Sequence, residues 1–600
     1  MNLSHLLAVG VLAGTLATGA RADEPLKIAD LAPEGTFLVV GVDRLDEICA
    51  RFDKTPLAGL LRSKPIRKLY QDDIKDGIDE MMEELGKEGL VGPDGELDLP
   101  DSFGLAMFTD LDEETGMNKA FLMGFAEWRG SPEAAGRIFD YMIEKAEDSE
   151  MTRMDRKEVQ GRDVTVIETI EEDEMDGGDE DFGEFDAMMM FGDPSEMAPD
   201  LTTTYIVRDR GRLIFANDLL AIDDALSAVD GDNRRPLSGV DAWTRTERQL
   251  GDSDAYVGIF TDPLQDLLAP MFMGPLGIVK PLIGEVFGDI KAYGFSASIP
   301  ESDNVSLITS MSILAPGDKA GIPGLMRITS PVGAAPPRMV GDNAFGYGMM
   351  NLDFKGLMPL ANQIAGAMPM GGEQMEMSLQ QFGPMAESAF ATMGPAMHVI
   401  STGDQGAAAG SLAAATIAIP TSDPQKVQPM LALLGPSMDL EPREFKGETI
   451  WGNETQGLAM SVAGNWFLVG SPKQVEQIVR SMDDPDGLAP LAKDRTFDAA
   501  VRALPSDDVV AWGYTNLVEQ YAQQRDMMME MPDLGDMQGF DEFGPGNELP
   551  FDPSMMRGPL EQITPKDLEP YVGPTVWTFT TDDMGWVMRS WLLHPIEGDA

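Results

Sequence analysis

Histidine is the side chain on which general acid–base and triad chemistry most often relies, because it titrates near neutral pH. Beyond the N-terminal segment the chain has only His398 and His594. His398 stands in the apolar run AMHVIST, which is typical of a histidine in a core or on a sheet face, and His594 lies close to the C-terminus. The single cysteine, Cys49, has no histidine near it and is interpreted as a small buried hydrophobic residue. We therefore predict no catalytic residue.

Motifs for nucleophilic catalysis and phosphate binding are also missing. The nearest match to a G-x-S-x-G nucleophile elbow is GFSAS at 294–298, which ends in Ser298 where glycine is needed. The stretch GDQGAAAG at 403–410 lacks the GK[ST] ending of a phosphate-binding loop, and a hairpin turn explains it. We predict no cofactor and no enzymatic activity, and carboxylate-only chemistry, which has no motif, is the remaining catalytic alternative.

The acidic run 170–200 is the main candidate for a metal site. Hard cations favour several oxygen ligands, so its carboxylates could bind Ca²⁺ weakly and collectively. Met175 and Gly177 stand where an EF-hand needs oxygen ligands, so the spacing fits no EF-hand. A solvated loop without bound metal is the simpler interpretation of this run, and we favour it. The candidate calcium ligands are Asp173, Asp176, Asp179, Asp181 and Glu184.

Methionine clusters at 188–190, 527–529 and 555–556 could in principle hold Cu(I) through their thioethers. The 42 methionines of the chain are scattered through expected helices as well as loops. Flexible packing explains that distribution better than a copper site.

Charge is the unusual feature of the composition. With 101 acidic and 44 basic residues the net charge is -57. Such a surface repels phosphate backbones and anionic headgroups, so nucleic-acid binding and charge-driven membrane binding are disfavoured. Partners are expected to be a protein or a small ligand.

The length of the chain bears on its domain organisation. A chain of 600 residues is too long for one core, which predicts two to four domains.

The N-terminus has the pattern of a secretory signal peptide. Leu6 to Ala20 is an uninterrupted apolar and small run, and Ala20-Arg21-Ala22 is an A-x-A cleavage pattern, although Met1 to His5 contains no Lys or Arg. We predict cleavage after Ala22, a mature start near Asp23, and a location in the periplasm or outside the cell. A retained leader acting as an anchor is the alternative. No later stretch is long enough to span a bilayer.

The sequence contains an internal duplication. Residues 204–229 superpose without a gap on 457–482, giving strand, turn, strand, cap and helix in each copy. In this superposition Gly211 matches Gly464, and Asp218 and Ser471 are the predicted N-caps. Hairpins are expected to recur at about 104–127 and 396–419, and again at 293–314 and 574–593.

These repeats predict an α+β fold with two tandem modules of long antiparallel hairpins and helices on one side. The predicted organisation is a signal peptide at 1–22, a linker at 23–30, module 1 at 31–315, a Gly/Pro linker at 316–337 and module 2 at 338–600. Three segments are interpreted as disordered surface loops inserted into the modules, namely the acidic run 170–200 and the Met-rich stretches 365–393 and 524–558.

The entry LAPEGTFLVVGVDRLDEI, the following TPLAGLL and the repeated GRLIFANDLLAIDDAL and NWFLVGSPKQVEQIV resemble a group of exported bacterial proteins known only as a domain of unknown function. The resemblance spans most of both modules and rests on strand, turn and helix signatures. It implies a bacterial envelope or secreted setting. It implies no activity, ligand or functional residue.

The sequence as a whole favours a non-catalytic extracytoplasmic binding or scaffold protein of unknown ligand. One alternative is divalent-cation handling, with Ca²⁺ held by the acidic insert. The other is a carrier of a hydrophobic ligand, which the apolar, proline-interrupted stretch 263–287 suggests.

Overall fold

The fold is taken from a computed structural model. It describes residues 26–73, 98–111, 118–149, 151–170, 199, 202–231, 235–268, 289–317, 321–327, 335–368, 372–402, 415–483, 489–505, 509–530 and 562–596. Within these residues, no helix combines the length and the apolar character needed to cross a membrane.

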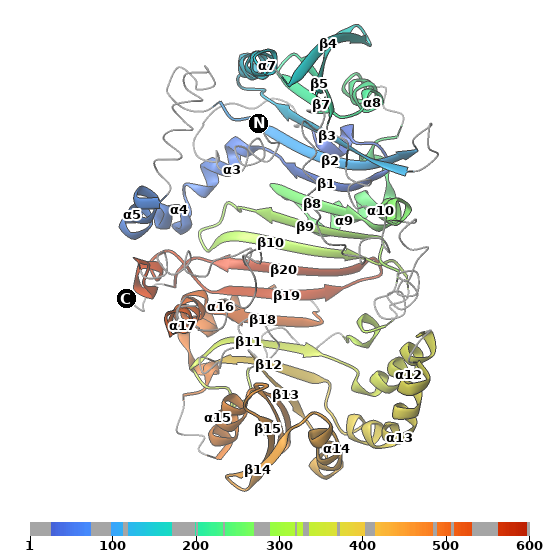
Figure 1. The fold of residues 1–600 in the computed structure, drawn as a ribbon. Coiled ribbons are helices and arrows are strands. Elements are labelled where there is room, and N and C mark those ends of the chain that lie inside the picture. The colour runs from blue at the N-terminus through green and yellow to red at the C-terminus, as the bar shows by residue number, and fades with distance from the viewer. Residues whose placement is uncertain are drawn as a thin grey trace, which may run out of the picture.

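The described strands all belong to one antiparallel sheet (Figure 1). The first ten are β1 (Thr36–Val42), β2 (Ser102–Leu111), β3 (Asn118–Glu127), β4 (Thr152–Val159), β5 (Arg162–Thr169), β6 (Thr203–Asp209), β7 (Arg212–Ala216), β8 (Ala255–Phe260), β9 (Ala292–Ser298) and β10 (Val305–Leu314). The next ten are β11 (Ala344–Asn351), β12 (Ala396–Thr402), β13 (Thr416–Pro420), β14 (Glu441–Phe445), β15 (Glu448–Asn453), β16 (Leu458–Ala463), β17 (Trp466–Gly470), β18 (Ala511–Thr515), β19 (Thr575–Thr581) and β20 (Gly585–Leu593).

The two halves of the chain have the same strand order. Across the first half, the pairings run β4-β5-β6-β7-β3-β2-β1-β8-β9-β10. Across the second half they run β14-β15-β16-β17-β13-β12-β11-β18-β19-β20. The halves meet where β10 pairs with β20, its counterpart by order. The sheet therefore extends without a break from β4 at the top of Figure 1 to β14 at the bottom.

The predicted hairpins at 104–127, 396–419, 293–314 and 574–593 are present as β2–β3, β12–β13, β9–β10 and β19–β20. Two further hairpins, β4–β5 and β14–β15, were not predicted. Their turns are Gln160-Gly161 and Lys446-Gly447, in which both residues have positive φ, as a two-residue turn of type I′ requires. In the β6–β7 and β16–β17 hairpins, the turns are 210–211 and 464–465, so Gly211 and Gly464 occupy different turn positions.

Helices cover both faces of the sheet. In the first half they are α2 (Ile28–Leu31), α3 (Leu45–Phe52), α4 (Pro56–Leu61), α5 (Lys64–Asp73), α7 (Pro132–Glu147), α8 (Leu219–Val229), α9 (Asp241–Leu250) and α10 (Thr261–Leu268). In the second half they are α12 (Leu357–Ala367), α13 (Gly372–Phe390), α14 (Pro424–Ser437), α15 (Pro472–Asp483), α16 (Arg495–Arg502), α17 (Leu517–Glu530) and α19 (Pro565–Leu568). Short 3₁₀ turns lie at Leu237–Gly239, Pro323–Leu325, Phe354–Gly356 and Leu491–Lys493.

The prediction of helices on one side is wrong. Leu213 packs with α7, whereas the next residue, Ile214, packs with α8. In the second half, Phe467 packs with α14 and Leu468 with α15. Consecutive strand residues point to opposite faces, so one face is covered by α7 and α14 and the other by α8 and α15. We call these the α7 face and the α8 face.

The Met-rich stretch 365–393 is not a loop. It contains the end of α12 and all of α13, whose Ala389 is buried and whose Met385 and Phe390 pack against the apolar cluster under α14. Met, Gln and Glu are good helix formers, which explains the difference. The other predicted loops lie mostly outside the described residues, but 524–530 belongs to α17.

The N-terminal strap, residues 26–32, belongs to the core of the first half. Ile28 is completely buried, and α2 contacts β1, β2 and α8. Leu237, in the 3₁₀ turn before α9, donates its backbone N–H to Ala32 at 2.8 Å. The predicted linker at 23–30 and the module boundary at residue 31 therefore need correction, because that boundary falls inside α2.

Candidate functional site

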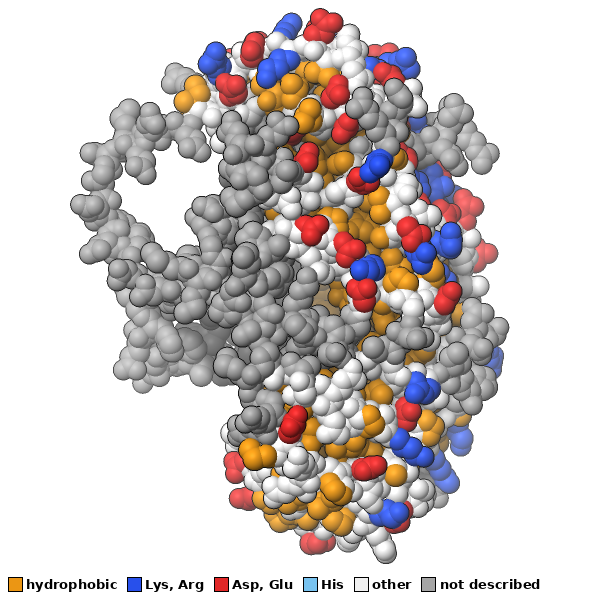
Figure 2. Space-filling model, turned by 90° about the vertical axis from the view of Figure 1, so that its right-hand side faces the viewer, with side chains coloured by type: hydrophobic (Ala, Val, Ile, Leu, Met, Phe, Trp, Pro, Cys, Tyr) orange, Lys and Arg blue, Asp and Glu red, His pale blue; other side chains and the backbone are white. Residues whose placement is uncertain are grey.

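The five candidate calcium ligands, Asp173, Asp176, Asp179, Asp181 and Glu184, lie outside the described residues. Among the described residues, no group of three or more His, Cys, Asp or Glu side chains is arranged to hold a metal ion. On the face that Figure 2 shows, acidic and basic side chains are interspersed, with hydrophobic ones between them. The negative charge is not gathered into a patch on that face.

His398 lies in β12 on the α8 face and is buried. Its Nδ1 is 2.8 Å from the Tyr347 hydroxyl, and its ring packs edge-on against Trp466. Loss of hydration lowers the pKa of His398 from its ordinary 6.5 to about 4, because burial penalises the charged imidazolium. Cys49 is buried on α3, and His594 follows the end of β20.

The burial of His398 predicts a loss of stability in acid. The unfolded chain takes up a proton at this side chain below about pH 6.5, while the folded chain does so only near pH 4, so stability falls as pH drops through this window. The free energy of unfolding of the wild type should fall as the pH drops through this window. We expect that of a His398→Gln variant to fall by about 2–3 kcal/mol less. Urea denaturation of both proteins over this pH range measures it, and parallel curves would contradict the assignment.

A row of polar residues crosses the α8 face at one end of the sheet in the first half. Ser102 pairs directly with Glu127. The N–H of Asp43 donates to the Asp254 carbonyl at 2.8 Å, and the N–H of Asp254 donates to Ala297 at 3.0 Å. Val42 is opposite Phe103, so the next residues along, Asp43 and Ser102, lie side by side. Ala255 is opposite Ala297, which places Asp254 beside Ser298 in the same way. The polar row is Glu127, Ser102, Asp43, Asp254 and Ser298.

The same row in the second half has no ionisable side chain. Asn351 is the counterpart of Asp43, since its N–H donates to the Val510 carbonyl at 3.1 Å just as Asp43 donates to Asp254. Asn351 pairs with Ala396 on β12. The counterpart row is Pro420, Ala396, Asn351, Val510 and Thr580. The polar row is therefore a property of the first half alone.

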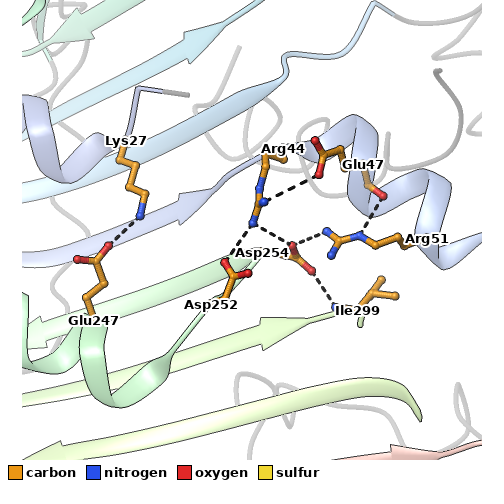
Figure 3. A network of polar contacts seen from close by, with 8 residues as sticks. All are labelled: Lys27, Arg44, Glu47, Arg51, Glu247, Asp252, Asp254 and Ile299. Atoms are coloured by element: carbon orange, nitrogen blue, oxygen red, sulfur yellow. Dashed lines mark hydrogen bonds and ion pairs between the residues drawn. The ribbon is translucent and has the colours of Figure 1, made fainter. Parts of the chain in front are cut away.

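The outer carboxylates of the polar row are held by arginines. Glu127 accepts from Arg212 at 2.6 Å and lies 3.5 Å from Arg129. Asp254 accepts from Arg51 at 2.5 Å and from the backbone N–H of Ile299 at 2.8 Å (Figure 3). These contacts tie the row to α3 and to the strands on either side.

Two further ion pairs lie beside the row in Figure 3. Arg44 has a left-handed backbone with φ of 56° and reaches Asp252 at 3.2 Å. Lys27 of the N-terminal strap reaches Glu247 of α9 at 2.8 Å, and both side chains are 40% exposed. The Lys27–Glu247 pair thus joins the strap to α9 at the surface of the site.

Asp43, in the middle of the row, is only 4% exposed. Desolvation raises its pKa from 3.8 to about 6, and the cations Lys27 and Arg44 offset part of that rise. The carboxyls of Glu247 and Asp30 add to the rise by repulsion. Asp43 is therefore a buried carboxyl that exchanges its proton near pH 6.

Two buried hydroxyl groups belong to the same site. Ser102 is completely buried and Tyr256 is 5% exposed, and neither hydroxyl has a hydrogen-bond partner among the described residues. The Tyr256 phenol lies over Gly41, where a Cβ would collide with it. Desolvation, with repulsion from Asp43 next, raises the pKa of Tyr256. The site thus combines a titrating carboxyl with two hydroxyl groups that can accept a hydrogen bond or bind a water molecule.

A cavity of about 300 Å³ lies in the second half, away from the polar row. It is lined by Asp342, Ala489, Pro490, Lys493, Asp494 and Arg495. The Asp494 carboxylate already caps α16 by accepting from the N–H of Phe497 at 2.7 Å. Of the two carboxylates that line the cavity, Asp342 and Asp494, one is therefore already engaged in capping a helix.

Sequence reasoning did not find the polar row. One signal was present, because Asp43 and Asp254 directly flank the apolar strands TFLVVGV and AYVGIF. No family model matches this chain, and no match is found among curated proteins or among solved structures.

Proposed function

We propose that this chain is a non-catalytic binding or scaffold protein that works outside the cytoplasm. The observation that carries the proposal is the continuous sheet. Nine register pairs join β10 to β20, and the same strand order lies on both sides of that joint. Ladder hydrogen bonds along so many strands resist bending and shear, so the sheet is a long, stiff platform from which connecting segments can contact a protein or a small ligand.

We also propose that the two halves are copies of one module. Besides the strand order, the halves share a local contact that a common ancestor explains. Leu491 donates its N–H to Val340 at 3.0 Å, the counterpart of the Leu237–Ala32 bond in the strap. Trp243 and Phe497 are both buried on the helix that follows this contact. In each half the aromatic residue, Trp243 or Phe497, belongs to the apolar core on the α8 face.

A binding role suits the polar contacts better than catalysis does. The outer carboxylates of the polar row already bind arginines and backbone N–H groups, so they are not available to attack or deprotonate a substrate. Asp43 is only 4% exposed and is therefore almost inaccessible to a substrate. These contacts stabilise the platform.

The exported setting can be tested on the full chain with its leader. We expect expression in a Gram-negative bacterium to deliver the protein to the periplasm with a mature N-terminus near Asp23. Cell fractionation and N-terminal sequencing measure both. Protein found in the cytoplasm with Met1 intact would contradict the proposed location.

Calcium titration of the purified protein separates the scaffold from the cation-handling alternative. We expect negligible heat of binding from the intact protein and from a variant that lacks residues 171–198. A binding isotherm that disappears with the deletion would favour calcium handling instead.

A further inference from the structure

The N-terminal strap lies next to Asp43, which is almost completely buried. Ile28, Ala29 and Leu31 are buried against the first-half core, and α2 touches both β1 and β2 beside the polar row. Leu26 donates its N–H to Glu127 at 3.4 Å. Docking of the strap therefore removes the middle of the row from water.

Polar or charged groups from several elements surround Asp43. The strap supplies Lys27 and Asp30, and α9 supplies Glu247. Arg44 follows Asp43 in the chain, and its guanidinium is directed to Asp252. The remaining neighbours are the hydroxyls of Ser102 on β2 and Tyr256 on β8. Lys27 is the one cation on the strap itself, and it donates its hydrogen bond to Glu247 rather than to Asp43.

We propose that Asp43 is a proton-operated latch for the N-terminal strap: proton uptake by its carboxyl tightens α2 on the sheet, and proton release loosens it. An ionised carboxylate at this position is a buried charge without a direct counter-ion, and opening the strap lets water reach it. A protonated carboxyl is neutral, so its burial under a closed strap costs much less free energy. It can also donate a hydrogen bond, and two unpartnered hydroxyls lie on the neighbouring strands.

The direction of the effect follows from linkage. Asp43 holds its proton up to about pH 6 in the folded chain but releases it near 3.8 when exposed. The stabilisation from this proton is complete below about pH 3.8 and is lost as pH rises through about 6. The strap should therefore open more readily above this window.

The second half provides an internal comparison, because Asn351 is an uncharged side chain of almost the same shape at the counterpart of Asp43. An Asp43→Asn variant gives the first half the same neutral group. Asp252→Asn is the matched control, since that carboxylate lies beside the polar row, where it pairs with Arg44, but is 91% exposed.

Hydrogen exchange of the full chain, followed by mass spectrometry, tests the latch. At about pH 7.5 we expect strap and β1 peptides of the wild type to open on the order of 10- to 100-fold more often than those of Asp43→Asn. The difference should shrink to below about tenfold at about pH 4.5. Asp252→Asn should follow the wild type. Equal exchange in wild type and Asp43→Asn at both pH values would overturn the proposal.

A direct titration covers the case in which Asp43→Asn does not fold. Carbon-13 NMR of aspartate-labelled wild-type protein should show a buried carboxyl with a midpoint near pH 6, and the strap resonances should shift with the same midpoint. A carboxyl that titrates near pH 6 without any change in the strap would contradict the latch. So would the absence of any aspartate titrating above about pH 5.

Discussion

Replacing Ile28 with aspartate should unfold the first half of the protein. Ile28 is completely buried, in a core that includes Val39, Ala106 and Phe125. The substitution removes an apolar side chain from that core and leaves a carboxylate there without a partner. Each effect alone costs several kcal/mol, so we expect a loss of about 5 kcal/mol or more in the free energy of unfolding. Chemical denaturation of the full chain measures it.

The control for this prediction is Leu61→Asp. Leu61 is 52% exposed at the end of α4, so the same charge there remains in water. We expect a change of no more than about 0.5 kcal/mol from this variant. If Ile28→Asp were as stable as the control, the strap would not be part of the core.

A proline at Thr309 should separate the two halves. Thr309 is in β10, which pairs with β9 on one side and β20 on the other. Proline has no backbone N–H, and its ring disturbs a central strand, so we expect a loss of about 3 kcal/mol or more. The denaturation curve should also change from one transition to two, because each half keeps its own apolar clusters.

Thr309→Val is the matched control. The side chain is exposed, and valine is β-branched like threonine, so the ladder and the strand propensity are kept. This variant should unfold in a single transition close to that of the wild type. A single, unshifted transition for Thr309→Pro would mean that β10 and β20 do not couple the halves.

Local patterns in the sequence predicted many elements correctly. The helix at 219–229 begins after Asp218, whose carboxylate accepts from the N–H groups of Leu220 and Ala221, as an N-cap should. Ser471 plays the same part by accepting from Gln474 at 3.3 Å. Such signals involve residues two or three apart, which is why one sequence is enough to recognise them.

The outer strands were missed because they lack an apolar pattern. β4 reads TRMDRKEV, and β14 reads EPREF with Pro442 inside it. Charged residues and proline are typical of edge strands, where they prevent pairing with another chain. The same residues that hide these strands in the sequence therefore end the sheet at both sides.

The helices on both faces could have been predicted from β7 and β17. Their sequences, RLIFA and WFLVG, are apolar at nearly every position instead of every second one. Such a run indicates a strand that is buried on both sides. The interpretation as a one-sided sheet overlooked this signal.

The polar row could not be predicted in the same way. Asp43, Ser102 and Glu127 come from three strands and meet Asp254 only because β1 lies between β2 and β8. Strand order depends on contacts between distant parts of the chain, and no local pattern encodes it. The contrast with Asn351 in the second half likewise appears only after the registers are known.

The central claim is that β10 and β20 join two like halves into one sheet. Thr309 and Ser590 lie directly opposite each other in that joint, at a separation typical of antiparallel pairs, which a disulfide can bridge. We predict that a Thr309→Cys, Ser590→Cys variant forms this disulfide on mild oxidation, as seen by peptide mass spectrometry. Thr309→Cys with Arg589→Cys, whose side chains point to opposite faces, should not form one. A bridge in the second variant and none in the first would contradict the joint.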